Sequence, residues 1–414
     1  MIFCSDGSSV VSGGQESWSL VAGGDVCPIG RVEQILLSGG SEVLMGADLV
    51  RTLRDADLTL LNLESPVCAT ESPIRKTGPN FIASPLMLPP LKAAGMDIAS
   101  LANNHVMDQG VEGLASTLEQ LRNCEIHFHG AGLTHQQARR RLRLEICGKH
   151  VSFINVAEGE FAQCLENGAG AARLEPVLTC AEIARAREDC EIVIVSVHAG
   201  NEYQPFPSPY IQRLYRHFVD AGADLVLGHH PHIPQGIEKY ARGLIIYSLG
   251  NFLFDYAGHV GKTCTRIGFL VRIGFDDSNI CSIRAIPFRQ RDDATVRQLS
   301  REQLPIFADY LNAVSEPLSS EDGLRALWEQ QVRQLFQSTY QPLFETHYQA
   351  LVKPLNIDTL ASCVFFNLFR CEAHNEALKT AFRLMHESRF EEDAEARMRI
   401  DAVLEILEKL VNSD

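Results

Sequence analysis

The sequence lacks the features that would mark a disulfide-bonded or membrane-spanning protein. Its twelve cysteines form no Cys-x-x-Cys pair, and several lie in apolar runs, as Cys147 does in 144–147. A chain of 414 residues does not need disulfides to fold, so we expect reduced thiols and a cytoplasmic protein. No window approaches the ~20 apolar residues of a membrane span. Residues 1–17 are polar and rich in Gly and Ser, without the basic and apolar regions of a signal peptide, and are predicted to be a flexible leader.

An excess of positive charge is also missing. The chain has 37 basic and 52 acidic residues and a net charge of −15. Its summed field repels phosphates, which argues against a general binder of nucleic acid or anionic membranes. A small anionic substrate would need a local positive site, and a pair of metal ions would supply one.

What the sequence does contain is typical of a globular protein with two or three units. Hydrophobic residues make up 45% and charged residues 21%. Apolar runs alternate with helix-like segments from residue 18 to residue 290, and helical periodicity dominates 291–414. We therefore predict one α/β domain over 18–290 and a helical C-terminal domain over 291–414, which could bind a protein partner.

Several segments have the pattern of a defined element. The helix expected over 208–221 has Ser208 at its N-cap and Pro209 at its first position. Further helices are expected over 42–54, 85–95, 110–124 and 400–411. Strands are expected over 18–25, 57–64, 96–102, 191–197, 223–227 and 244–249, and hairpins over 142–156 and 267–288.

The densest cluster of candidate ligands is Gly228-His229-His230-Pro231-His232, which follows a short apolar strand. Neutral imidazole is the commonest metal ligand among side chains. His230 and His232 are two positions apart, so only a non-helical loop lets both point at one ion. The alternative is a surface turn that happens to be rich in histidine.

Five other strand-like runs also end in groups suited to metal or phosphate. These groups are Asp25, the pair Asn62 and Glu64, the turn Asn103-Asn104-His105, His198, and Asn251. In open α/β sheets, ligands bind outside the carboxyl ends of the strands. Mixed nitrogen and oxygen donors suit Zn²⁺, Mn²⁺ or Fe.

Each residue alone has an ordinary structural explanation. Asp25 could be a turn residue, Asn103–His105 a helix N-cap or Asx-turn, His198 a half-buried histidine, and Glu64 a solvent-facing side chain. The set is stronger than any member, because unrelated explanations would not place such groups at the ends of so many strands.

Taken together, these motifs resemble the CapA/PgsA family, bacterial proteins of poly-γ-glutamate capsule synthesis that are similar in fold to the calcineurin-like metallophosphoesterases. The resemblance covers about residues 18–290. The stretches that carry it are Gly23–Asp25, Asn62–Pro66, Ala102–His105, Asp108–Gly110, His198–Tyr203, Gly228–His232 and Ser248–Phe252.

The resemblance implies an αββα metallophosphatase-like sandwich with one or two divalent transition metal ions, Mn, Fe or Zn, between its two sheets. The metal ligands it implies are Asp25, Glu64, Asn104, His198, His230 and His232. It also implies that His105 acts as the acid on the leaving group. The chain differs from the usual pattern at Cys27, where a histidine is common, and at Glu64, where the bridging carboxylate is commonly aspartate.

Other polar residues are assigned lesser roles. Glu202, Tyr203 and Asn251 are expected to orient substrate or ligands. Arg75 and Lys76 could contact an anionic substrate. The basic run Arg139, Arg140, Arg141 and Arg143 is expected to be a solvated face.

The sequence thus predicts a metal-dependent hydrolase that acts on a phosphoester or a γ-glutamyl-type amide, with Asp25, Asn104 and His105 as catalytic residues. The alternative is a non-hydrolytic subunit of a polyglutamate-synthesising or peptide-ligating complex. A third hypothesis is a thiol function through Cys27. Members of the CapA/PgsA family commonly carry a membrane anchor, which is not expected here.

Overall fold

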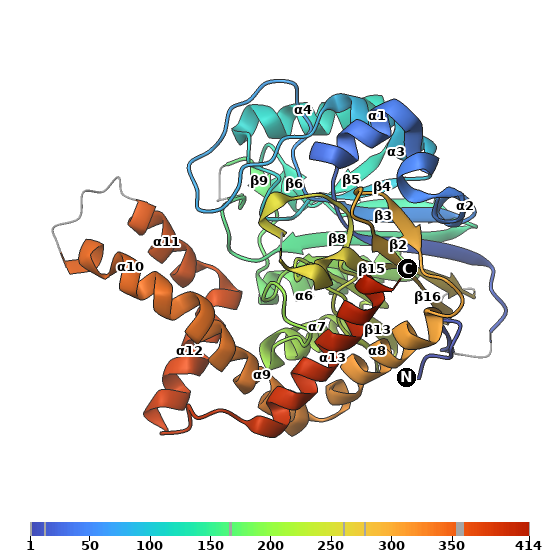
Figure 1. Ribbon diagram of the computed structural model, residues 1–414. Coiled ribbons are helices and arrows are strands. Elements are labelled where there is room, and N and C mark those ends of the chain that lie inside the picture. Colours follow the sequence, from blue (N-terminus) through green and yellow to red (C-terminus); the bar gives the residue numbers. More distant parts are fainter. Residues whose placement is uncertain are drawn as a thin grey trace.

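The computed structural model describes residues 2–11, 14–164, 168–259, 261–276, 279–352 and 360–413. Within these residues the chain forms a nine-stranded sheet, a six-stranded sheet and a small two-stranded ribbon of β6 (Ala131–Gly132) and β9 (Gly170–Ala171). Figure 1 shows helices covering the sheets and a group of C-terminal helices beside them.

The first large sheet has a parallel half and an antiparallel half. Strands β2 to β5 run parallel to one another, and β14 runs parallel to β2, whereas β15, β16, β1 and β17 pair antiparallel. Its order is β1 (Ser8–Val10), β16 (Ile280–Gln290), β15 (Ile267–Phe275), β2 (Trp18–Cys27), β3 (Leu58–Leu63), β4 (Ile98–Ser100) and β5 (His127–His129), with β14 (Asn251–Phe254) on β2 and β17 (Val296–Gln298) on β16.

The second large sheet has four parallel central strands with an antiparallel strand at each edge. Its order is β12 (Ile237–Tyr240), β13 (Gly243–Ile246), β11 (Leu225–His229), β10 (Ile192–His198), β8 (Lys149–Ala157) and β7 (Leu142–Ile146). Every residue of β10 is buried. That burial explains its unbroken apolar run, because parallel strands are covered on both faces.

The two sheets pack face to face with helices outside. Along β2, Leu20 and Ala22 join the core shared with the six-stranded sheet, whereas Val21 joins the core under the outer helices. The helices on that side are α1 (Gly30–Met45), α2 (Ala47–Arg54), α3 (Leu88–Ala93) and α4 (Gly110–Asn123), and those against the other sheet are α6 (Pro176–Asp189) and α7 (Pro209–Ala221). This confirms the predicted αββα layering.

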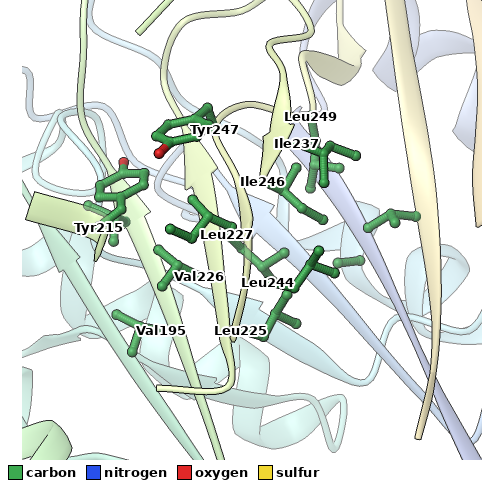
Figure 2. Close-up of a cluster of buried hydrophobic side chains, with 14 of the residues drawn as sticks. Val195, Tyr215, Leu225, Val226, Leu227, Ile237, Leu244, Ile246, Tyr247 and Leu249 are labelled. Carbon is green, nitrogen blue, oxygen red and sulfur yellow. The ribbon is translucent and has the colours of Figure 1, made fainter. Parts of the chain in front are cut away.

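The core beneath the histidine loop is tightly packed. In Figure 2, Tyr215 of α7 lies beside Tyr247, close to the aliphatic side chains of β11. The two rings stack with centroids 5.5 Å apart and an interplanar angle of 6°. Val226 and Leu227 are fully buried, and each such side chain contributes ~1.5–3 kcal/mol. This packing fixes β11, the strand that leads directly into His230 and His232.

The C-terminal extension is helical, as predicted. It consists of α8 (Leu304–Ser315), α9 (Glu321–Leu335), a π-helical turn (Phe336–Tyr340), α10 (Gln341–Val352), α11 (Leu360–Arg370), α12 (Glu372–His386) and α13 (Ala394–Asn412). Helix α13 returns to pack on α8 and α9 through its buried stripe of Ile400, Val403, Leu407 and Leu410. Figure 1 shows α10 and α11 standing away from the sheets. The domain boundaries at residues 17 and 290 stay a prediction.

Local details differ from the sequence-based expectations in two places. The N-terminal stretch, predicted to be a flexible leader, contributes β1, which pairs with β16, and its Phe3 is buried. The backbone N–H of Phe3 donates to Asn312 at 2.9 Å. The helix predicted over 42–54 is split, because Gly46 has a φ of 76° and ends α1 before α2 begins.

No helix in the described ranges has both the length and the apolar character needed to cross a bilayer. None of the twelve cysteines, all of which lie in those ranges, is joined in a disulfide.

Candidate metal centre

The parallel strands of both sheets end at one common site. Asp25 lies in β2 opposite Asn62 of β3, and Asn251 of β14 pairs with Asp25 from the other side. In the second sheet, His198 ends β10 and pairs with His229 at the end of β11. The chain leaves both sheets here, so polar side chains from separate strands meet.

Asp25 is fully buried and surrounded by donors. Its Oδ1 accepts from Asn62 Nδ2 at 2.8 Å and lies 3.4 Å from His229 Nδ1. Its Oδ2 accepts from the backbone N–H of His230 at 3.3 Å and lies 3.4 Å from His232 Nδ1. Burial alone would raise the pKa of Asp25, but hydrogen bonds from His229 and His232 outweigh it and hold the pKa well below its usual range. Asp25 is therefore a buried anion.

His198 is the point where several groups crowd together. Its Nε2 lies 3.0 Å from Asn104 Oδ1, 3.1 Å from His230 Nδ1 and 3.6 Å from Glu64 Oε1. Burial, followed by the charge of His230, lowers the pKa of His198 well below its usual value. A neutral imidazole is the form that binds metal.

Glu64 has unusual surroundings for a carboxylate. It is fully buried, and neither of its oxygens has a hydrogen-bond partner. Burial, followed by the charge of Asp25, raises its pKa well above the usual range. Buried polar groups are nearly always paired, so two unpaired carboxylate oxygens are an observation that calls for a ligand.

The histidine loop holds a strained backbone. His230 and His232 have φ values of 96° and 60°, and Tyr203, which stacks on His232, has 62°. Such conformations cost of order 1–3 kcal/mol each and cluster at functional sites. His232 Nδ1 donates to Asn251 Oδ1 at 2.8 Å, which orients the ring.

A second, linked group surrounds His105. Its Nδ1 lies 2.7 Å from Asp108 Oδ2, and Asp108 forms an ion pair with Lys76. Asp108 also accepts from the backbone N–H of Phe81 at 2.7 Å, and the Phe81 ring lies 4.3 Å from that of His105. Burial, followed by the charge of Lys76, lowers the pKa of His105. The ring of His105 is thus held in one orientation.

Three overlapping sets of side chains at this site have ligand atoms within 4.8 Å of one another. They are Glu64 with His198 and His230, Asp25 with Glu64 and His232, and Glu202 with His230 and His232. Glu64 belongs to the first two sets. Asn104 lies beside the first set, because its Oδ1 is close to Nε2 of His198. All six predicted metal ligands therefore lie together.

The predicted substrate-binding residues are less uniform. Glu202 Oε1 lies 3.9 Å from His232 Nε2, and Tyr203 has Lys262 Nζ 3.4 Å above its ring. The Lys76 side chain is only 2% exposed, because it pairs with Asp108, whereas Arg75 is exposed. The structure thus places Lys76 beside His105 as a buried ion-pair partner.

Two nearby acidic residues, Glu158 and Glu160, are not among the residues predicted from the sequence. Glu158 follows β8, is buried, and has an oxygen 3.6 Å from His230 Nε2. Glu160 lies two residues further along the same loop and is also buried. Both follow a predicted strand, so the strand-end rule could have found them. His229 was seen as part of the motif, but its contact with Asp25 depends on the fold.

Two other features have no direct part in the site. Cys27 is fully buried with Phe81 and Phe254, and burial, followed by the charge of Glu64, raises its thiol pKa well above the usual value. That environment disfavours a reactive thiolate. In the basic run, Arg139 pairs with Glu182 and Arg141 with Asp189.

The chain is similar in sequence to curated bacterial proteins of capsule biosynthesis. The capsule biosynthesis protein CapA of Bacillus anthracis is 26% identical over 325 residues, which covers 76% of this chain and 76% of that protein. The PGA biosynthesis protein CapA of Bacillus subtilis (strain 168) is 30% identical over 239 residues, 56% of this chain and 62% of that one.

A crystal structure of a hypothetical protein from Thermus thermophilus overlaps with a TM-score of 0.42 and 16% identity, covering 66% of this chain and 99% of that one. That overlap is too loose to bear on function. The family of the bacterial capsule synthesis protein PGA_cap matches residues 19–256, which are 238 of the 414 residues. This chain therefore belongs to the PGA_cap family of bacterial capsule synthesis proteins.

Proposed function

We propose that this protein is a metal-dependent hydrolase that acts in the synthesis or processing of poly-γ-glutamate. The proposed metal ligands are Asp25, Glu64, Asn104, His198, His230 and His232. The observation that carries the proposal is Glu64, whose two oxygens are buried and unpaired and which belongs to two of the sets of candidate ligands.

The donor set fits one or two divalent transition metal ions. Imidazole suits Zn, Fe and related metals, and carboxylate and amide oxygens suit Mn. The buried negative charge of Asp25, beside Glu64, also favours a cation at this position. A bound ion of this kind would supply Lewis-acid chemistry, because it polarises the attacked group and makes water a nucleophile at neutral pH.

The chain's own residues would place and protonate the substrate. Because Nδ1 of His105 is held by Asp108, Nε2 is the ring nitrogen that would take up a proton and give it to the leaving group. Lys76 neutralises Asp108 and so keeps that carboxylate in place. Asn251 orients His232 through its side-chain oxygen.

We propose a phosphoester or a γ-glutamyl-type amide as the substrate. The names of the Bacillus relatives, which concern the biosynthesis of capsule and of PGA, support a γ-glutamyl compound. Both substrates are anionic. Lys262, which lies over the Tyr203 ring beside His232, and the exposed Arg75 would attract such a group.

The test is hydrolysis of p-nitrophenyl phosphate, bis(p-nitrophenyl) phosphate and γ-glutamyl-p-nitroanilide with Mn²⁺, Fe²⁺ or Zn²⁺ added. We expect metal-dependent release of the chromophore from at least one substrate. Asp25→Asn should lower the rate more than about 100-fold, which is a larger effect than substitutions of residues that only support the metal ligands usually have. Asp189→Asn removes an exposed carboxylate that pairs with Arg141 and is the matched control. Absence of hydrolysis by metal-loaded protein would contradict the proposal.

A second candidate function is a non-hydrolytic subunit of a polyglutamate-synthesising or peptide-ligating complex. The observation that favours it is three exposed phenylalanines on the C-terminal helices, Phe366 and Phe369 on α11 and Phe382 on α12, which are 60%, 68% and 52% exposed. Elemental analysis separates the two functions. A loss of about one or two equivalents of transition metal in His230→Ala favours the hydrolase, and a metal content that this substitution leaves unchanged favours the subunit.

A further inference from the structure

A separate group of potential metal ligands lies where the C-terminal helices meet the α/β sandwich. Glu160, Cys371 and His374 offer a carboxylate oxygen, a thiol sulfur and a ring nitrogen, all within 4.8 Å of one another. Glu160 is 8% exposed and Cys371 is 1% exposed. None of the three belongs to the six proposed ligands of the central site.

The fold brings these residues together from distant parts of the chain. Glu160 lies in the loop after β8, Cys371 is the N-cap of α12, and His374 lies three positions further along, on the same face of that helix. Because Cys371 and His374 share one helix start, their spacing is set by the helix itself.

The loop after β8 and the start of α12 are joined by several hydrogen bonds. The backbone N–H of Ala373 donates to Glu158 Oε2 at 3.1 Å, and the backbone N–H of Gly159 donates to Glu372 Oε2 at 2.5 Å. Arg370 Nε donates to the carbonyl oxygen of Gly159 at 2.9 Å. Glu160 is therefore held next to Cys371 before any ion binds.

Outer contacts already orient two of the three side chains. His374 Nδ1 lies 3.0 Å from the hydroxyl of Tyr340, which leaves the other ring nitrogen for a ligand. Asn367 Nδ2 donates to Glu160 Oε1 at 3.3 Å. Metal-binding histidines and carboxylates commonly have such partners on the side away from the ion.

The electrostatics of the group also favour a cation. Burial, followed by the charges of Glu158 and Glu160, raises the pKa of the Cys371 thiol well above its usual value. A divalent ion would offset these carboxylates and stabilise the thiolate, because metal binding replaces the thiol proton.

We propose that Glu160, Cys371 and His374 bind a zinc ion that fastens the start of α12 to the loop after β8. Zinc takes thiolate, imidazole and carboxylate ligands at about 2.0–2.3 Å, which places the ligand atoms roughly 3.3–3.6 Å apart. Since these ligand atoms already lie within 4.8 Å of one another, the side chains need to close by at most about 1.2–1.5 Å.

The position of this site links it to the central site. Its three residues line a cavity of about 390 Å³, together with His230, Glu202 and Tyr340. A three-ligand zinc site keeps a fourth position open, and here that position would face the cavity. The ion would therefore hold the helical wall of the cavity in place next to the proposed catalytic residues.

Cobalt substitution tests the proposal in the full-length protein. A thiolate bound to Co²⁺ gives a charge-transfer band in the near ultraviolet, and none of the six proposed central ligands is a cysteine. We expect the band in wild-type protein, its loss in Cys371→Ser, and its retention in Cys27→Ser, the matched control. Glu160→Gln, which keeps an acceptor for Asn367, should weaken cobalt binding more than about 10-fold.

Circular dichroism identifies any variant that fails to fold. If Cys371→Ser does not fold, the weaker cobalt binding expected of Glu160→Gln tests the proposal instead. A cobalt-loaded wild-type protein without the band, or a band that persists in folded Cys371→Ser, would overturn the proposal. Neither result depends on hydrolysis, so failure of this proposal is distinct from failure of the proposed function.

Discussion

Replacing Glu64 by glutamine should change stability in opposite directions with and without metal. Both Glu64 oxygens are buried and lack partners, and an unsatisfied buried group costs ~1–3 kcal/mol. In a chelator, the neutral amide of the variant replaces a carboxyl group whose charged form is strongly disfavoured. Burial raises the pKa of Glu64 above its usual range, so keeping this carboxyl group neutral near pH 7 costs free energy that the uncharged glutamine does not lose. We therefore expect the free energy of unfolding of Glu64→Gln to rise by ~1–3 kcal/mol under these conditions.

With metal present, the order should reverse. A metal ion present at a concentration 100 times its dissociation constant stabilises the wild-type protein by about 2.7 kcal/mol. Glu64→Gln should lose most of this stabilisation. For 414 residues, an unfolding entropy of about 2.1 cal/mol/K per residue converts 1 kcal/mol to about 1 °C in Tm. The wild type should thus gain about 3 °C with metal, and the variant should be about 1–3 °C more stable than the wild type in chelator.

Differential scanning calorimetry in EDTA and in Mn²⁺ or Zn²⁺ measures both effects. Glu145→Gln, at an exposed position of β7, is the matched control and should follow the wild type in both buffers. A Glu64→Gln variant that is less stable than the wild type in EDTA, or that gains as much from metal, would refute the reasoning.

Three further predictions concern other buried groups. Burial raises the pKa of Glu376 to about 7, so its unfolded form releases its proton first and stability should fall as pH rises from about 4.5 to 7. Glu376→Gln should remove up to about 3 kcal/mol of this loss. In urea unfolding, the free energy of unfolding of the variant should therefore be higher than that of the wild type at pH 8 and equal to it at pH 4.5. Equal free energies of unfolding at pH 8 would count against this prediction. If the proposed hydrolysis is observed, Cys27→Ala should retain it, and iodoacetamide should not inhibit the native protein, because the thiol is buried; inactivation by alkylation would revive the thiol hypothesis. Lys76→Met leaves Asp108 without its ion-pair partner, which should cost about 3 kcal/mol or more in urea unfolding and leave the metal content unchanged; loss of metal would mean that Lys76 supports the central site directly.

The central part of the fold and the site could be predicted because their signals are local. Apolar runs such as 191–197 and 223–227 identify buried strands, and the parallel order of these strands brings their ends together. Asp25, His198 and His230 therefore converge as expected. The N-cap of α7 at Ser208, whose side chain accepts from the backbone N–H of Ile211, is another local signal that the structure bears out.

The remaining features depend on contacts between distant segments, which no periodicity reveals. The sequence suggests that Lys76 could contact substrate, but Lys76 pairs with Asp108 because the loop before Phe81 packs against the turn that precedes α4. Glu160 meets Cys371 only because α12 packs against the loop after β8. In both cases the residue types were visible in the sequence, but their partners were set by tertiary packing.

The most direct test of the central claim is an anomalous difference map from crystals grown with Mn²⁺ and measured with X-rays chosen to enhance the manganese signal. We expect a peak within bonding distance of Glu64 and His198, with His230 or Asp25 as a further ligand. A fully loaded crystal with no peak among these residues would contradict the proposed metal centre and the hydrolytic function that depends on it.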